Sequence, residues 1–289
     1  MKRMLCALAL TILLTGCALQ RELPEDSAAP AGEEILLVID GREVPAWRYL
    51  CWLDRAVAQG LEGEAAREQA LGDTALYAAV ESLAEEWGVA LTAAEEAALT
   101  PGVWAALEEA QWRELAAVGA LYAKLCEREV PQETLEAFGK ERGYRTVDRI
   151  LIPAGEGADK QAAEVFARLN GGGEEAFHAA KSLSADRLGP RTFCSGDGTL
   201  APELEEAAAA LSEGQLSGIL ESEEGFSILY CLPLDIEQMR IPWLDEQLRT
   251  RVEEADIQVL SGYENLGISA GFPSNENKIQ DYAQQASSS

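Results

Sequence analysis

The hydrophobic and polar positions follow two different spacings along the chain. Residues 35–39 form a continuous apolar run, which predicts a buried strand, and Asp40 and Gly41 after it form a strong turn signal. Apolar positions at helical spacing follow in segments that open near residues 44, 64, 92, 100 and 131. Residues 35–143 are therefore expected to form a helical domain that one strand introduces.

The next stretch, residues 144–235, has a mixed pattern. Its predicted order is strand, helix, helix, loop, helix, strand, strand, and Pro202 stands in the first turn of the third helix. The segments that carry this pattern are strand-like at 144–152, 215–221 and 225–233, and helical at 158–170, 177–180 and 198–207. Beyond this stretch, apolar residues at helical spacing predict one long amphipathic helix over 243–260.

Three motifs in this stretch occur in a fixed order. They are Gly198-x-Leu-x-Pro-x-Leu-x-x-Ala207, Leu211-x-x-Gly214-x-x-Ser217 and the strand start at Gly225. Together with the order of elements they resemble the parvulin family of peptidyl-prolyl cis-trans isomerases, and the flanks resemble lipid-anchored extracytoplasmic foldases of the PrsA/SurA type.

This resemblance implies an α+β fold built in two parts. A parvulin-like domain, a small antiparallel sheet flanked by helices, is expected at 144–235. It is expected to be inserted in a mainly helical SurA/PrsA-type domain, which 35–143 and a returning C-terminal helix within 236–270 form together.

The first sixteen residues are expected to be a targeting sequence rather than part of the fold. Lys2 and Arg3 give a positive start, and the apolar run 4–14 is too short to span a bilayer. Leu14-Thr-Gly-Cys17 resembles the lipobox of bacterial lipoproteins, which implies a signal peptide at 1–16 and lipid on Cys17. The alternative is a cleaved secretory peptide with a coincidental cysteine.

The remaining ends of the chain lack periodicity. Residues 17–34 are expected to be a tether that lifts the folded part off the membrane, and residues 271–289 a flexible tail. With the lipid on Cys17, these features predict an extracytoplasmic protein that is lipid-anchored to the outer face of the cell membrane.

The net charge limits the partners. A formal charge of −27 disfavours nucleic acid, because neutralising phosphates takes clustered Lys and Arg, and it disfavours charge attraction to an anionic membrane surface. A simpler interpretation is that the acidity keeps the chain soluble. The cysteine spacing matches no metal-ligand pattern, so no metal is predicted. The resemblance implies unfolded or partly folded exported proteins as partners.

The candidate site follows from the chemistry that the resemblance implies. Rotating an X-Pro amide crosses a barrier of roughly 18–20 kcal/mol and breaks no bond, so no cofactor is expected. An apolar socket is implied at Leu200 and Leu204, where the family usually has Met and Phe, with Phe226 nearby. Asp186 stands where the family has Cys or Asp, and Ser222 matches a Ser or Thr of its polar network. The alternatives are core packing for the leucines and a solvated, turn-capping role for Asp186.

Members of the family have two central histidines, one in the first strand and one in the last strand of the domain, and this chain lacks both. Those positions hold Arg149 and Ser227, while the single histidine, His178, matches neither and is expected at the surface. A charge at Arg149 needs a partner, for which Asp186 and Asp148 are the candidates. The loop after the first strand lacks the basic cluster of phosphate-directed members, so phosphoserine specificity is not expected.

Two hypotheses follow from the matches and the departures. The first is an isomerase that acts on exported polypeptides. The second is a catalytically silent chaperone that keeps the parvulin scaffold for binding only.

Overall fold

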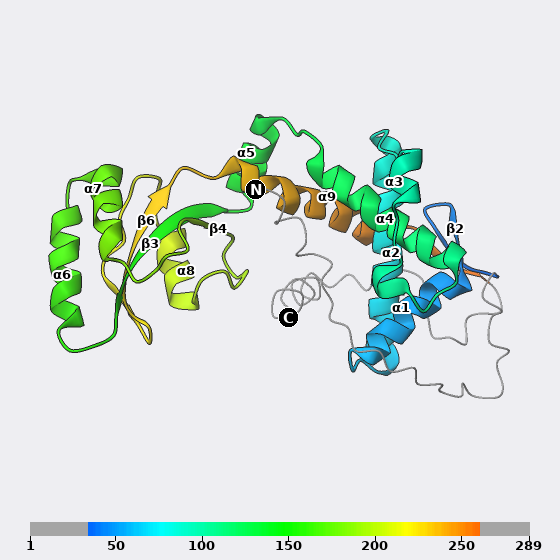
Figure 1. Cartoon of the computed structure of the whole chain (residues 1–289), viewed down its shortest axis with the longest axis horizontal. Helices are drawn as coiled ribbons and strands as arrows, with labels where there is room; N and C mark the ends of the chain where they lie inside the picture. The colour runs from blue at the N-terminus through cyan, green and yellow to red at the C-terminus, as the bar shows by residue number, and fades with distance from the viewer. Residues whose placement is uncertain (1–33, 261–289) are drawn as a thin grey trace. The chain divides into compact units, whose positions relative to one another are not determined.

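The computed structural model describes residues 34–260 of the chain (Figure 1). The predicted signal peptide, Cys17, the C-terminal tail and most of the tether lie outside the described residues. The described part falls into two compact units, residues 34–129 together with 244–260, and residues 130–243. None of the helices within 34–260 combines the length and the apolar character that crossing a membrane requires.

The first unit is mainly helical and carries a small antiparallel sheet with the strand order β2-β1-β7. Asp40 and Gly41 have φ values of +48° and +80°, so the predicted turn is confirmed as a tight β1–β2 hairpin. Residues 42–45 form β2, and the prediction of a helix from residue 44 is wrong by two residues. The elements are β1 (Ile35–Ile39), β2 (Arg42–Pro45), α1 (Ala46–Ala58), α2 (Gly63–Glu86), α3 (Ala93–Ala97), η1 (Gly102–Trp104), α4 (Glu109–Glu127), α9 (Arg240–Glu254), which begins in the second unit, and β7 (Ile257–Val259).

The C-terminal helix is shorter than predicted. The expected helix over 243–260 ends at Glu254, and β7 pairs with β1 instead of continuing it. The backbone N–H of Asp256 donates to Asp40 Oδ1 at 2.9 Å, which ties the start of β7 to the β1–β2 turn. The β-branched isoleucine and valine of β7 favour this extended backbone. The prediction of one helix to residue 260 is therefore wrong.

Aromatic packing and a capping box order the helices of the first unit. The ring centroid of Trp52 on α1 lies 4.8 Å from that of Tyr77 on α2 and 5.0 Å from that of Trp104, both edge to face. Thr92 and Glu95 form a capping box at the start of α3, where the sequence predicts that a helical segment begins.

The second unit is an antiparallel sheet, strand order β4-β3-β6-β5, with helices on both faces. The predicted succession of helices and strands is confirmed, with the short β4 added, so the expected α+β class holds. Figure 1 shows α6 and α7 together at one side of β3 and β6, and α8 at the other. The elements are α5 (Gln132–Glu141), β3 (Arg145–Pro153), α6 (Ala158–Leu169), α7 (Gly173–Ala180), η2 (Lys181–Leu183), β4 (Arg191–Phe193), α8 (Pro202–Ala209), β5 (Leu220–Ser222), β6 (Gly225–Leu232) and η3 (Ile236–Met239).

Side chains alternate between the two faces of this sheet. Ile150 of β3 and Ile228 of β6 are register partners and pack with α6 and α7. Val147 points to the opposite face, where residues of α8 cover it. Because successive strand residues point to opposite faces, Arg149 and Ser227 both lie on the α8 face.

Gly225 is required where β6 begins. Its φ is +131°, and a Cβ atom there would lie 2.1 Å from the carbonyl oxygen of Ile152 and 2.5 Å from the amide nitrogen of Ala154. Both are backbone atoms that cannot move without breaking the strand pair, so only glycine allows this close approach. Gly225 thereby fixes the register that brings Arg149 and Ser227 to one face.

Candidate functional site

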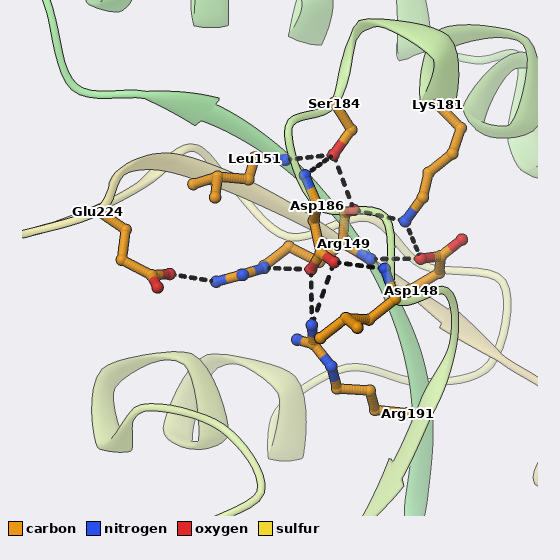
Figure 2. A network of polar contacts seen from close by, with 9 residues as sticks. Asp148, Arg149, Leu151, Lys181, Ser184, Asp186, Arg191 and Glu224 are labelled. Atoms are coloured by element: carbon orange, nitrogen blue, oxygen red, sulfur yellow. Dashed lines mark hydrogen bonds and ion pairs between the residues drawn. The ribbon is translucent and has the colours of Figure 1, made fainter.

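The centre of the candidate site is an ion pair on the α8 face of the sheet. Arg149 Nε donates to Asp186 Oδ2 at 2.7 Å, and Arg149 Nη1 donates to Glu224 Oε2 at 2.7 Å (Figure 2). The arginine side chain is 11% exposed, whereas that of Glu224 is 61% exposed. Of the two candidate partners predicted for Arg149, Asp186 and Asp148, it is Asp186 that pairs with the guanidinium. One partner of the guanidinium is therefore buried and the other is at the surface.

Asp186 is enclosed by donors. Besides Arg149, Arg191 of β4 donates from Nη2 to both carboxylate oxygens at 2.9 and 3.1 Å, and the amide of Leu188 donates to Oδ1 at 3.0 Å. Burial of the carboxyl raises its pKa, but the Leu188 amide and the two guanidiniums together lower the pKa of Asp186 below its ordinary value. The group is thus held as a carboxylate.

The loop that carries Asp186 is fixed against β3. The Ser184 hydroxyl accepts from the Leu151 amide at 2.9 Å and from the Asp186 amide at 3.0 Å, and the Ala185 amide donates to the Leu151 carbonyl at 2.8 Å. β4 pairs with β3 only over 145–147, so these contacts satisfy the strand edge where β4 has ended. The position of Asp186 therefore depends on backbone contacts as well as on its charge.

A second ion pair lies beside the first. Lys181 Nζ pairs with the buried carboxylate of Asp148 and donates to the Arg149 carbonyl at 2.7 Å (Figure 2). Asp148 Oδ1 also accepts from the Arg149 amide at 2.8 Å. Asp148 therefore accepts a hydrogen bond from the backbone amide of Arg149, and Asp186 accepts one from its side chain.

The two serine positions differ in their surroundings. Ser227 is fully buried, and its hydroxyl has no hydrogen-bond partner among residues 34–260. Ser222 lies at the end of β5, where its hydroxyl donates to the Gly225 carbonyl at 3.4 Å. In this hairpin it is Glu224, two residues further on, that reaches Arg149.

The predicted socket residues are packed rather than open. Leu200 is 7% exposed and Leu204 is 1% exposed, in a cluster with Val147 and other apolar side chains between α8 and the sheet. Phe226 packs with the cluster under α6 and α7, so it lies on the opposite face of the sheet. The structure brings the two leucines together and separates Phe226 from them, so the expectation that Phe226 lies near them is wrong.

Sequence reasoning missed four members of the polar network. Arg191 reaches the ion pair because β4 pairs with β3, and Glu224 reaches it because the β5–β6 hairpin lies beside β3. These segments are far apart in the sequence. Lys181 and Ser184 precede Asp186 by five and two residues. The Ser184-x-Asp186 spacing was a usable signal, because Ser and Asp at this spacing favour turn contacts with nearby amides.

Within residues 34–260, the arrangement consists of charged groups that ion pairs hold in place. His178 is half exposed on α7, as predicted, and lies near Glu174 of the same helix at 3.3 Å. No group of three or more His, Cys, Asp or Glu in the described part of the chain could hold a metal ion. X-Pro rotation needs neither a nucleophile nor a metal, so a site of this composition is compatible with binding a twisted amide.

Comparisons with known proteins point to one family. Residues 153–232 match a family model described as Rotamase: PPIC-type PPIASE domain, and no curated protein matches the chain. Similar solved structures include PrsA from Bacillus subtilis, with 15% identity over 87% of this chain and 98% of that chain and a TM-score of 0.30. Peptidylprolyl isomerase (PrsA) from Bacillus cereus has 16% identity, coverage of 89% and 99%, and a TM-score of 0.28. Foldase protein PrsA from Streptococcus pneumoniae has 13% identity, coverage of 83% and 88%, and a TM-score of 0.28.

TM-scores this low carry no argument about activity, and the family match covers only the second unit. That match begins at the last residue of β3 and includes α6, α7, β4, α8, β5 and β6, with the glycine that begins β6. Residues 153–232 of this chain form a parvulin-type, PPIC-type peptidyl-prolyl isomerase domain.

Proposed function

We propose that the protein is an extracytoplasmic, membrane-anchored folding factor whose parvulin-type domain acts on X-Pro bonds of exported polypeptides. The family match over 153–232 is the observation that carries this proposal. The lipobox-like sequence before Cys17 supports the anchor, with 1–16 as signal peptide and 17–34 as tether. Residues 35–143 and 236–270 would form the helical domain around the parvulin-type domain, and 271–289 the tail.

The proposed site uses the residues that the resemblance marks. Asp186 and Ser222 would act on the polar side of the rotating amide, and Leu200 and Leu204 on its apolar side; Phe226 is not included, because it lies on the opposite face of the sheet. A thousandfold acceleration needs about 4 kcal/mol of preferential binding to the twisted amide. With the leucines packed, this binding requires α8 to shift away from the sheet when a proline ring enters.

A second candidate function is a catalytically silent chaperone. Two observations favour it. The Arg149 position carries a guanidinium that is paired with Asp186, and the Ser227 position carries a buried hydroxyl that has no hydrogen-bond partner among the described residues. The leucines that would form the socket are 7% and 1% exposed. A domain with these features would bind polypeptide through its surface and would not accelerate rotation.

Exchange spectroscopy on a proline-containing peptide separates the two functions. The full chain and its Asp186→Ala variant are compared for the rate of cis-trans exchange and for suppression of aggregation of an unfolded client. Exchange above background that the variant loses supports the isomerase. Suppression of aggregation without exchange leaves only the chaperone, and the absence of both activities overturns the proposal.

The anchor is tested separately. Cys17→Ser should move the protein from the membrane fraction to the soluble extracytoplasmic fraction, whereas Cys6→Ser should leave its location unchanged. If both variants stay with the membrane, the lipid is not on Cys17.

A further inference from the structure

The guanidinium of Arg149 has one permanent partner and one exchangeable partner. Asp186 is 5% exposed and is also held by Arg191 and the Leu188 amide. Glu224 is 61% exposed on the turn between β5 and β6, and its carboxylate contacts Arg149 Nη1 (Figure 2). An exposed carboxylate in an ion pair is easily exchanged, because such pairs contribute little to stability.

The charges of this centre balance only while Glu224 is in place. Arg149 and Arg191 carry two positive charges, and Asp186 and Glu224 carry two negative charges. The neighbouring Lys181 is already neutralised by Asp148. When Glu224 moves away, one positive charge remains uncompensated on an arginine side chain that is 11% exposed. A partly buried charge of this kind favours a replacement anion.

A second donor lies on the same face. Ser227 is buried, its hydroxyl has no partner among the described residues, and it sits diagonally across the strand pair from Arg149, since Arg149 is the register partner of Leu229. The α8 face therefore presents a guanidinium N–H and an unsatisfied hydroxyl. Both groups can donate to a carboxylate oxygen.

We infer that Arg149 and Ser227 form a subsite for a carboxylate side chain of the bound polypeptide, which Glu224 occupies in the free protein. The inference rests on the proposed function, because it assumes that an extended proline-containing segment binds on the α8 face. It names the substrate class as segments that carry Asp or Glu next to the proline.

The chemistry of the subsite favours a single carboxylate over a phosphate. Release of Glu224 exposes one positive charge, and a phosphate with nearly two negative charges would need a second cation. The loop that follows β3 supplies no such cation, since residues 153–159 contain Glu156 and Asp159 and no Lys or Arg. The net charge of −27 repels acidic segments at long range, so the preference must come from this local contact.

Peptide binding tests the inference directly. Fluorescent peptides of the form Ala-X-Pro-Phe, with X as Glu, Gln or Lys, are titrated against the full chain. The Glu peptide should bind about three- to tenfold more tightly than the Gln peptide, the size of a net charge-assisted hydrogen bond that replaces another. The preference should fall as salt rises toward 1 M.

Two matched variants test the role of Glu224. Glu224→Gln removes the internal competitor and should tighten binding of the Glu peptide about two- to fivefold, with little effect on the Gln peptide. Glu223→Gln changes the net charge equally in the same turn and should leave both affinities unchanged. Arg149→Gln should abolish the preference for Glu, with its fold checked by circular dichroism.

The outcomes separate this inference from the function beneath it. Equal binding of all three peptides, or equal effects of Glu224→Gln and Glu223→Gln, overturns the carboxylate subsite and leaves the folding function standing. Failure of every peptide to bind, with no exchange and no suppression of aggregation, overturns both.

Discussion

Replacing Asp186 with asparagine tests whether the buried centre holds the parvulin-type domain together. The carboxylate accepts from Arg149 at 2.7 Å, from Arg191 at 2.9 Å and from the Leu188 amide at 3.0 Å. Asp186→Asn keeps the size of the side chain and removes its charge. Two guanidiniums, 11% and 17% exposed, are then left with the surface carboxylate of Glu224.

The expected cost is about 3 kcal/mol in the free energy of unfolding of this domain. Removing one partner of a buried ion pair typically costs about 3–5 kcal/mol. The lower value applies because both arginines keep some contact with water and can relax toward it. A loss of about 3 kcal/mol corresponds to a roughly hundredfold fall in amide protection of a strand that exchanges through unfolding of the domain.

Hydrogen exchange measured by mass spectrometry is the suitable assay. Five of the six tryptophans lie within 34–129, so intrinsic fluorescence reports on the other unit. Peptides from β3 and β6 should lose protection in Asp186→Asn, whereas Glu164→Gln, an exposed charge removal on α6, should not change it. The double variant Asp186→Asn with Arg191→Gln should recover part of the loss, since it removes one uncompensated charge. A loss below about 1 kcal/mol would show that the centre contributes no more than a surface ion pair, and would refute this reasoning.

Three further predictions follow from the same domain. Gly225→Ala should prevent stable pairing of β3 with β6, because its Cβ would lie 2.1 Å from a backbone oxygen, whereas Gly155→Ala, with open space at its Cβ, should be tolerated; circular dichroism of the two variants compares them. Leu204→Ala should lower the free energy of unfolding by about 2–5 kcal/mol if the side chain belongs to the core. Leu188→Ala, at an 80% exposed position, should lower it by less than about 0.5 kcal/mol. Equally small effects of the two variants in a urea titration would indicate that Leu204 is not a core residue and lines the socket instead. The pKa of Asp186 is lower in the folded protein than in the unfolded chain. Its contribution to the free energy of unfolding is therefore fully present above the unfolded pKa of about 3.9 and is lost as the pH falls through the folded pKa. Stability should depend less steeply on pH in Asp186→Asn, as measured by acid titration.

Local pattern was sufficient for the order of elements in the parvulin-type domain, and it limited the partner of Arg149 to two carboxylates. A charge at the centre of a strand that reads as buried requires an opposite charge, and Asp186 was one of two nearby candidates. The structure selects it over Asp148 because Asp148 precedes Arg149 directly in β3 and therefore points to the other face.

The misplacement of Phe226 has the same physical basis and was avoidable. Phe226 and Ser227 are neighbours in one strand, so they cannot both face the same site. By contrast, β7 was not predictable from spacing alone. A segment of three residues directly after a helix is too short to distinguish the helical spacing of apolar residues from the alternation of a strand. Its pairing with β1 depends on contacts between residues more than 200 positions apart, such as that of Asp256 with Asp40.

The members of the buried centre act as one unit, and this governs how activity data on them are interpreted. Asp186→Ala removes a group near the proposed site and also leaves Arg149 and Arg191 without their shared carboxylate. A loss of exchange in that variant therefore has two physical explanations, a lost contact to the rotating amide or a displaced strand. Arg191→Gln separates them, because it leaves Asp186 paired with Arg149 and touches no proposed substrate contact. If Arg191→Gln keeps the exchange rate while Asp186→Ala loses it at equal amide protection of β3, the carboxylate acts on the substrate; if the rates follow the protection in both variants, Asp186 is a positioning residue.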